Sequence, residues 1–432
     1  MRVCVVGLWH LGTVTAACLA KGGHEVVGFD FSTEVVHRLQ NGEPPLFEPG
    51  LKELVQEGLS RGGLCFSTEV AEALRGAEVV WVAYDTPVDD QDRADVEFVV
   101  GCVTRLFPYL ERNTLVLISA QLPVGMTRRL ETSYATTYPD KGVSFGYSPE
   151  NLRLGKAIQS FTQPEQVVVG VREDVDRNRI KELFQPFTDR LEWMSVESAE
   201  MTKHALNSFL ATSIAFINEV ATLCEQVGAD AKEVERGLKG DSRVGPRAYL
   251  SPGAAFAGGT LARDIVYLAE IGAARGRPTH LLSAVRETND VHRHWPRQKL
   301  RSILRDLRGQ RVAVWGLTYK PGTDTLRRSA SVELCEWLAE QGARVRSHDP
   351  AVRTLPGELS RKFDLTPTPL AALEDATALV VATEWQQYQS ISPEEVLSTM
   401  KVPWVIDPNR FLVKTLGSDP RIHYMTVGKP DR

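Results

Sequence analysis

Short apolar runs alternate with amphipathic stretches through the first 195 residues. The runs are rich in β-branched residues, and helical patterns or loops separate each run from the next. Strands and helices in alternation favour a mostly parallel, doubly wound sheet. The predicted strands are residues 3–6, 25–29, 79–84, 115–119, 143–146 and 166–169.

The pattern changes at residue 196. Residues 196–227 have helical periodicity and contain neither proline nor glycine, which predicts one long helix, or two joined by a slight kink. From residue 299 the alternation returns, with predicted strands at 310–315, 344–348, 378–382 and 404–406. We therefore expect an α/β protein with two Rossmann-like domains, 1–195 and 299–432, joined by a long central helix and a helical segment over 196–298.

Composition limits the possible partners. The 432 residues suffice for two or three domains. A hydrophobic share of 43%, a charged share of 24% and a net charge of -5 fit a soluble protein with no footprint for nucleic acid or an anionic membrane. No uninterrupted apolar run approaches the roughly 18 residues of a membrane span, and no signal peptide pattern opens the chain. We expect a cytoplasmic protein that binds neither nucleic acid nor membrane.

The six cysteines show no CxxC pair and no metal-ligand spacing. Most lie inside apolar runs, where reduced and buried thiols are expected, and this suits a reducing compartment. We expect no metal site.

A glycine turn follows the first predicted strand. The letters GLWHLG at 7–12 lead into a helical pattern, and the next strand ends at Asp30. Gly7 permits the tight turn, the helix start offers N–H groups to a pyrophosphate, and Asp30 can bond the adenosine ribose, which favours NAD over NADP. Trp9 stands at the position of the middle glycine of such turns, so a structural turn with a closed pocket remains an alternative. The predicted cofactor residues here are Gly7, Trp9, Leu11, Gly12 and Asp30.

Seven further strings follow one another along the chain. They are EPGL at 48–51, DTP at 85–87, LPVG at 122–125, SPENL at 148–152, AEMTKHALNSFL at 199–210, DSRVG at 241–245 and GLTYKPGTD at 316–324. In this order they resemble the motifs of the UDP-glucose/GDP-mannose dehydrogenase family, over essentially the whole chain. The resemblance implies that NAD binds the first domain, with Thr86 and Pro87 beside it, and that a nucleotide sugar, most simply a UDP-sugar, binds the third. It also implies a homodimer formed by the long helix.

The resemblance assigns the catalytic roles as well. Lys203 and Asn207 are four positions apart on the predicted helix and therefore project from one face, where a cation and an amide can stabilise a developing alkoxide. By resemblance, Glu150 positions water or acts as an acid and base, and Asp264 orders water beside the lysine. Gln121 stands where the family commonly has threonine.

The chain departs from the family just before Asp264. The family reads GGSCFPKD there, and its cysteine is the nucleophile of a second oxidation. Residues 258–264 read GGTLARD, one residue shorter and without cysteine. Leu261 cannot act as a nucleophile, and Thr260 is a poor one without an adjacent base. The parts for a first hydride transfer are thus retained, and the thiolate for the second is absent.

Basic side chains and backbone in the second half are predicted to hold the nucleotide. A planar guanidinium suits bidentate recognition of phosphate, and the resemblance places Arg243 in a neighbouring subunit's site. The predicted substrate residues are Leu152, Arg243, Tyr249, Gly253, Lys320, Arg327 and Arg410.

Three hypotheses are compatible with this sequence. The first is NAD-dependent oxidation of a nucleotide sugar, to an aldehyde or on to an acid without a thiol. The second is a redox-neutral epimerase with tightly held NAD, which the missing thiol motivates. The third is a non-catalytic homologue that binds a nucleotide sugar, against which the retention of Lys203, Asn207, Glu150 and Asp264 argues.

Overall fold

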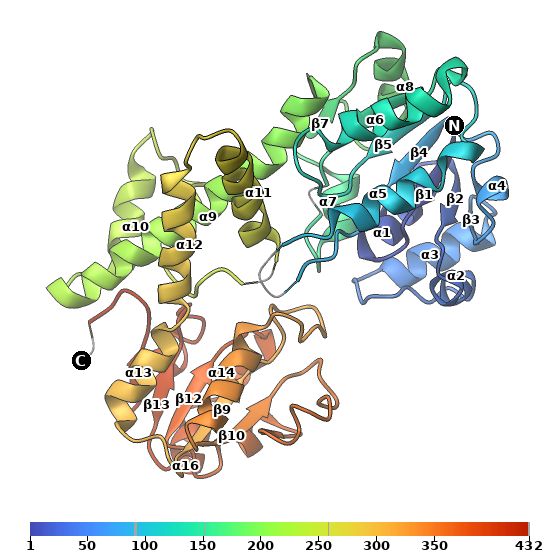
Figure 1. The fold of residues 1–432 in the computed structure, drawn as a ribbon. Coiled ribbons are helices and arrows are strands. Elements are labelled where there is room, and N and C mark those ends of the chain that lie inside the picture. The colour runs from blue at the N-terminus through green and yellow to red at the C-terminus, as the bar shows by residue number, and fades with distance from the viewer. Residues whose placement is uncertain (90–92, 151, 258, 431–432) are drawn as a thin grey trace. The chain divides into compact units, whose positions relative to one another are not determined.

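The structure is a computed structural model, and it describes residues 1–89, 93–150, 152–257 and 259–430. The chain divides into two compact units, Met1–Ala205 and Leu206–Arg432 (Figure 1). Two residues of the family-like strings, Asn151 and Gly258, lie outside the described residues.

The first unit is built on an eight-stranded sheet with the order β3-β2-β1-β4-β5-β6-β7-β8. All neighbouring strands are parallel except β6 and β7, which are antiparallel. The six predicted strands are present, and the sequence analysis missed β3 and β8. The strands are β1 (Arg2–Val6), β2 (Glu25–Phe29), β3 (Leu64–Ser67), β4 (Val79–Val82), β5 (Leu115–Ile118), β6 (Ser144–Tyr147), β7 (Val167–Gly170) and β8 (Leu191–Met194).

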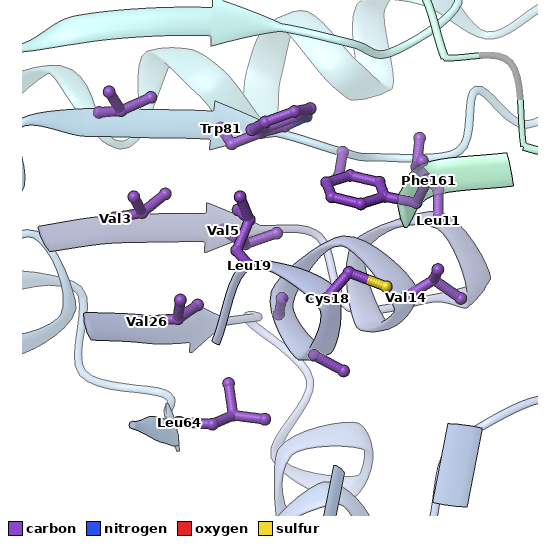
Figure 2. Close-up of a cluster of buried hydrophobic side chains, with 14 of the residues drawn as sticks. Val3, Val5, Leu11, Val14, Cys18, Leu19, Val26, Leu64, Trp81 and Phe161 are labelled. Atoms are coloured by element: carbon purple, nitrogen blue, oxygen red, sulfur yellow. The ribbon is translucent and has the colours of Figure 1, made fainter. Parts of the chain in front are cut away.

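Helices cover both faces of this sheet because its strands are apolar on both sides. The helices are α1 (His10–Lys21), α2 (Thr33–Gln40), α3 (Leu51–Ser60), α4 (Val70–Ala73), α5 (Val96–Thr104), α6 (Met126–Thr137), α7 (Ala157–Thr162) and α8 (Asp174–Phe184). Figure 2 shows the face that α1 covers, where Leu11, Val14, Cys18 and Leu19 meet strand residues such as Val3, Val5 and Val26. Helices α4, α5 and α6 pack on the other face.

The second unit combines helices with a six-stranded sheet of the order β11-β10-β9-β12-β13-β14. All of its strand pairs are parallel. Its elements after the long helix α9 (Val196–Val227) are α10 (Ala231–Gly240), α11 (Thr260–Ala274), α12 (His280–His292), α13 (Trp295–Leu304), β9 (Arg311–Trp315), α14 (Ala330–Glu340), β10 (Arg344–His348), β11 (Asp364–Leu365), α15 (Pro369–Leu373), β12 (Ala378–Val381), α16 (Pro393–Thr399), β13 (Trp404–Ile406) and β14 (His423–Met425). The expectation of two parallel-sheet Rossmann-like domains is confirmed.

The long helix α9 runs over Val196–Val227 without interruption, as the sequence predicted. By length and composition alone it could cross a membrane. However, it carries the buried side chains of Glu200 and His204, which bond to the loop before α6 and to the first turn of that helix. These polar contacts are those of a helix that packs into a protein core.

A glycine turn follows the first strand of each sheet, and an aspartate after the second strand accepts a hydrogen bond from it. Gly7 after β1 and Gly316 after β9 have φ of 90° and 91°, where a side chain would collide with the strand alongside. In the first unit the N–H of Leu8 donates to Asp30 at 2.7 Å. In the second, the N–H of Leu317 donates to Asp349, also at 2.7 Å.

Candidate active site

The turn after β1 has the geometry of a dinucleotide site. A Cβ atom on Gly12 would lie 1.7 Å from the carbonyl oxygen of Gly7, so helix and turn approach closely only because residue 12 is glycine. No side chain caps the start of α1, which leaves its first N–H groups for an anion. Leu11 is buried beneath the turn and packs into the core. Asp30 at the end of β2 completes a turn that fits NAD.

Trp9 occupies the N-cap position of α1, and 46% of its surface is exposed. Its side chain therefore stands on the surface of the turn and does not fill the turn itself. A residue with a Cβ at this position keeps the backbone farther from a pyrophosphate than glycine would. The turn retains its N–H groups, but a ligand cannot come as close to the backbone as it could beside a glycine.

Thr86 and Gln121 meet at the carboxyl ends of β4 and β5. The hydroxyl of Thr86 is buried and donates to the carbonyl oxygen of Gln121 at 2.7 Å. Pro87 is exposed, and its carbonyl oxygen accepts the N–H of Asp95 at 2.8 Å. The structure thus joins a predicted cofactor segment to a predicted catalytic one.

Glu48 connects three segments of the first unit, and the sequence analysis did not select it. Its buried carboxylate accepts the N–H of Gly155 at 2.7 Å and that of Ala157 at 2.8 Å. The ring of His10, the first residue of α1, lies 3.0 Å from the same carboxylate. The dinucleotide turn and the loop after β6 are therefore held together. The EPGL string marked Glu48 in the sequence, but no spacing rule could predict which residues bond to its carboxylate.

Lys203 and Glu150 are in contact within the first unit. The buried ammonium of Lys203 donates to the carbonyl oxygen of Glu150, and the carboxylate of Glu150 accepts the N–H of Leu152. The neighbours of Lys203 on α9 fix the helix in place. Glu200 accepts the N–H groups of 125 and 127 at 2.6 and 2.9 Å, and His204 lies 2.9 Å from the carbonyl oxygen of Leu122.

Asn207 and Asp264 form the corresponding pair in the second unit. Nδ2 of Asn207 donates to Oδ2 of Asp264, and both side chains are buried. Thr260 is the exposed first residue of α11, and it lies one turn before Asp264. Leu261 packs instead against the small apolar cluster that contains Ala211 and Ile265. The hydroxyl of Thr260, and not the side chain of Leu261, is available to a ligand.

Amide side chains and one histidine hold the loop before α11, and the sequence analysis missed all of them. The buried Gly253 donates its N–H to Asn218 at 2.9 Å, and its carbonyl oxygen lies 2.7 Å from Nε2 of His292. Asn289 makes two bonds to the backbone of Phe256, and Asn409 accepts the N–H of Ala254. Burial lowers the pKa of His292, so the ring donates in its neutral form. Polar residues on otherwise apolar helix faces were the available signal.

The other predicted substrate residues have different surroundings. Arg410 is largely buried and pairs with Asp230 at 2.7 Å, so its guanidinium supports the second unit. Arg243 is exposed and pairs with Asp241 at 2.8 Å, and Tyr249 is also exposed. The ammonium of Lys320 lies 5.6 Å from the ring centre of Tyr319. Arg327 is exposed.

Three domain models of one family match consecutive stretches of the chain. They describe the NAD binding domain, the central domain and the UDP binding domain of the UDP-glucose/GDP-mannose dehydrogenase family, and match residues 1–188, 197–291 and 313–414. A UDP-glucose 6-dehydrogenase of Pseudomonas aeruginosa is 33% identical over 444 residues, which covers 100% of this chain and 98% of that protein. The chain belongs to the UDP-glucose/GDP-mannose dehydrogenase family.

Further relatives agree with this assignment. A UDP-glucose 6-dehydrogenase of Rhizobium meliloti is 32% identical over the full length of both chains. A solved UDP-glucose dehydrogenase of the archaeon Pyrobaculum islandicum superposes with a TM-score of 0.86 at 30% identity, covering 94% of this chain and 96% of that one. Members of the UDP-glucose/GDP-mannose dehydrogenase family are NAD-dependent nucleotide-sugar dehydrogenases. This protein is accordingly an oxidoreductase that uses NAD and a nucleotide sugar.

All six cysteines of this family member are free thiols, and none belongs to residues 253–264. Five are buried, and Cys65 on β3 is exposed. Among the residues that the structure describes, no group of His, Cys, Asp or Glu side chains could hold a metal ion.

Proposed function

We propose that this protein oxidises C6 of UDP-glucose, or of a closely related UDP-sugar, and that water replaces a thiol in the second oxidation. One observation carries the proposal: α9 presents Lys203 and Asn207 one turn apart, with Glu150 bonded to the first and Asp264 bonded to the second. The names of the relatives from Pseudomonas aeruginosa and Rhizobium meliloti support UDP-glucose as the substrate.

In the first step the primary alcohol becomes an aldehyde. The alcohol loses its hydroxyl proton and a hydride from the same carbon. NAD, when bound at the turn after β1, would supply the hydride acceptor for this step and, as a second molecule, for the next. The ammonium of Lys203 and the amide of Asn207 stabilise the negative charge on the sugar oxygen while the proton leaves. Asp264 fixes the orientation of the Asn207 amide, because it accepts the bond from Nδ2.

In the second step water adds to the aldehyde carbon and gives a gem-diol. A second hydride then leaves this carbon, one hydroxyl proton is lost, and a carboxylic acid remains. Glu150 takes the proton of the attacking water as general base. Glu150 lines a cavity of the first unit together with Ser148 and Ser119, beside apolar residues such as Trp81, Phe161 and Phe184.

Product analysis tests the proposal. The purified protein is incubated with NAD and UDP-, GDP- or CDP-sugars, and mass spectrometry identifies the products while NADH is counted by absorbance. We expect a UDP-uronic acid and two NADH per sugar. An aldehyde with one NADH would contradict the water step, and a sugar of unchanged mass and altered retention would identify an epimerase. No product with any sugar would favour a binding protein.

We further propose that the protein is a homodimer formed through α9. Its large apolar side chains Leu206, Phe209, Phe216, Leu223 and Val227 are between 44% and 77% exposed. Successive members are three, seven, seven and four positions apart, so they lie on one side of the helix. We call these five residues the α9 stripe. A contiguous exposed apolar stripe is typical of an interaction surface. A second copy of the same helix offers a matching apolar face.

A further inference from the structure

A cation lies on an aromatic ring beside the predicted ribose site. Arg105 follows the last residue of α5, and its guanidinium carbon is 3.5 Å from the ring centre of Phe31. Phe31 is the residue directly after Asp30, and the ring of Phe29 supports it edge-on at 4.9 Å. No carboxylate pairs with Arg105 in the part of the chain that the structure describes. The aromatic contact therefore holds the guanidinium in place.

Fold geometry places the adenosine of NAD at this point. Ligands of doubly wound sheets bind at the carboxyl ends of the strands where the strand order reverses, which here is between β1 and β4. Asp30 is fixed there by the N–H groups of Leu8 at 2.7 Å and Ser32 at 2.9 Å. The adenine is bonded to the ribose that such an acid holds. The walls next to Asp30 are Phe31 and α5, the helix that follows β4.

The charges of Arg105 and Asp30 both act on the thiol of Cys102. Burial raises the pKa of this thiol on α5, the charge of Arg105 lowers it, and the charge of Asp30 raises it. Both charges act on the same buried sulfur, one from α5 and the other from the end of β2. The direct contact is the one with Phe31, the residue next to the ribose acid in sequence, over whose ring the guanidinium lies.

The exposed side of α5 is open beside Arg105. Phe98, Gly101 and Arg105 are spaced three and four positions apart, so they share one face of the helix. Phe98 is 45% exposed, and a Cβ atom on Gly101 would meet nothing within 4 Å. One side of the guanidinium rests on Phe31, and its other side remains available. A planar guanidinium stacks well on aromatic faces.

We propose that Arg105, held flat by Phe31, stacks on the adenine of NAD and provides affinity at the adenosine end of the cofactor. This compensates for Trp9, which keeps the pyrophosphate farther from the turn. The proposal depends on NAD binding and not on the identity of the sugar. Product analysis and cofactor binding can therefore fail independently.

Calorimetric titration of the full chain with AMP, NAD and nicotinamide mononucleotide tests the proposal. Arg105→Ala is expected to weaken AMP and NAD binding by the same factor, roughly 3- to 30-fold, and to leave nicotinamide mononucleotide unchanged. Arg105→Lys keeps the positive charge but lacks the planar guanidinium, so this variant is expected to resemble Arg105→Ala. Phe31→Leu removes the support and is expected to have a smaller effect in the same direction. Arg61→Ala is the matched control, because Arg61 is exposed on the first unit and pairs with Glu57 on the same helix surface, away from Phe31 in sequence.

Several outcomes would overturn the proposal. Normal AMP binding by Arg105→Ala would exclude the stack, and full rescue by Arg105→Lys would show that charge alone matters. A loss confined to NADP would assign Arg105 to a 2′-phosphate instead. A wild-type protein that binds NAD but not millimolar AMP would place the affinity elsewhere. Circular dichroism of each variant separates these results from misfolding.

Discussion

Asn207 on α9 donates a hydrogen bond to Asp264 on α11, across 57 positions of sequence. The bond orients the amide and leaves neither buried group without a partner. Because each residue fixes the other, the two form one unit of the proposed catalytic site.

Alanine substitutions at this pair should be strongly non-additive. We expect Asn207→Ala and Asp264→Ala each to lower kcat by roughly 100-fold, the usual cost of removing one stabilising donor. The double variant should be no worse than the poorer single variant, because either loss already disables the pair. Steady-state kinetics with UDP-glucose and NAD measure this. Multiplication of the two single effects would show that the residues act independently.

A thiol at residue 260 should accelerate the second oxidation. Thr260 is exposed at the start of α11, one turn before Asp264, and a helix start lowers the pKa of a cysteine. Thr260→Cys is therefore expected to speed acid formation from the supplied UDP-aldehyde by about tenfold or more. Leu261→Cys is the control, since Leu261 packs into an apolar cluster. A faster reaction in Leu261→Cys alone would contradict the orientation of this helix start.

Acid should remove the contribution of Glu197 to stability. The side-chain bond from Arg172 is the main reason that the pKa of Glu197 is lowered from 4.5 to about 2. Because the folded-state pKa is the lower one, the stabilisation is present above pH 4.5 and is lost as the pH falls towards 2. The carboxylate is 30% exposed, so we expect about 1 kcal/mol or less.

Denaturant unfolding of wild type and Glu197→Gln checks this prediction. The difference in midpoint should be clear at pH 7 and should shrink steadily from pH 4.5 downward. A difference that stays constant over this range would mean that Glu197 acts through packing and not through its charge.

Disruption of the α9 stripe should yield monomers. Phe216 is 50% exposed in the stripe, and Phe216→Glu would bury a charge without a partner in the proposed interface. We expect sedimentation to show a monomer with unchanged secondary structure. Val175→Glu is the control, because Val175 is 62% exposed on α8, outside the stripe. A dimer that survives Phe216→Glu would place the interface on another surface.

The fold could be read from the sequence where the pattern was strong. The apolar runs of β1 and β9 and the periodicity of α9 are local signals. By contrast, β14 has only three residues, His423–Met425, and its exposed first residue gives no apolar run. Its pairing with β13 comes from the neighbouring strand and not from its own letters.

The candidate site could be predicted only as far as motifs reach. The roles of Lys203 and Asn207 came from a family resemblance, and they remain proposals. Glu48 and His10 could not be paired in advance, because their contact depends on how α1 and the loop before α3 fold. Arg410 was chosen as a charge suited to phosphate, whereas its ion pair with Asp230 depends on tertiary structure.

The repeated turn of the two sheets has a consequence for mobility. Asp349 is almost fully buried, and its Oδ2 accepts bonds from Leu317, from both donors of Thr318 and from Trp385. The amide protons of Leu317 and Thr318 can therefore exchange with solvent only when the second unit opens. Asp30 accepts two bonds and keeps lone pairs for a ribose. The same glycine turn with its aspartate is thus open to a ligand in the first sheet and closed by internal hydrogen bonds in the second.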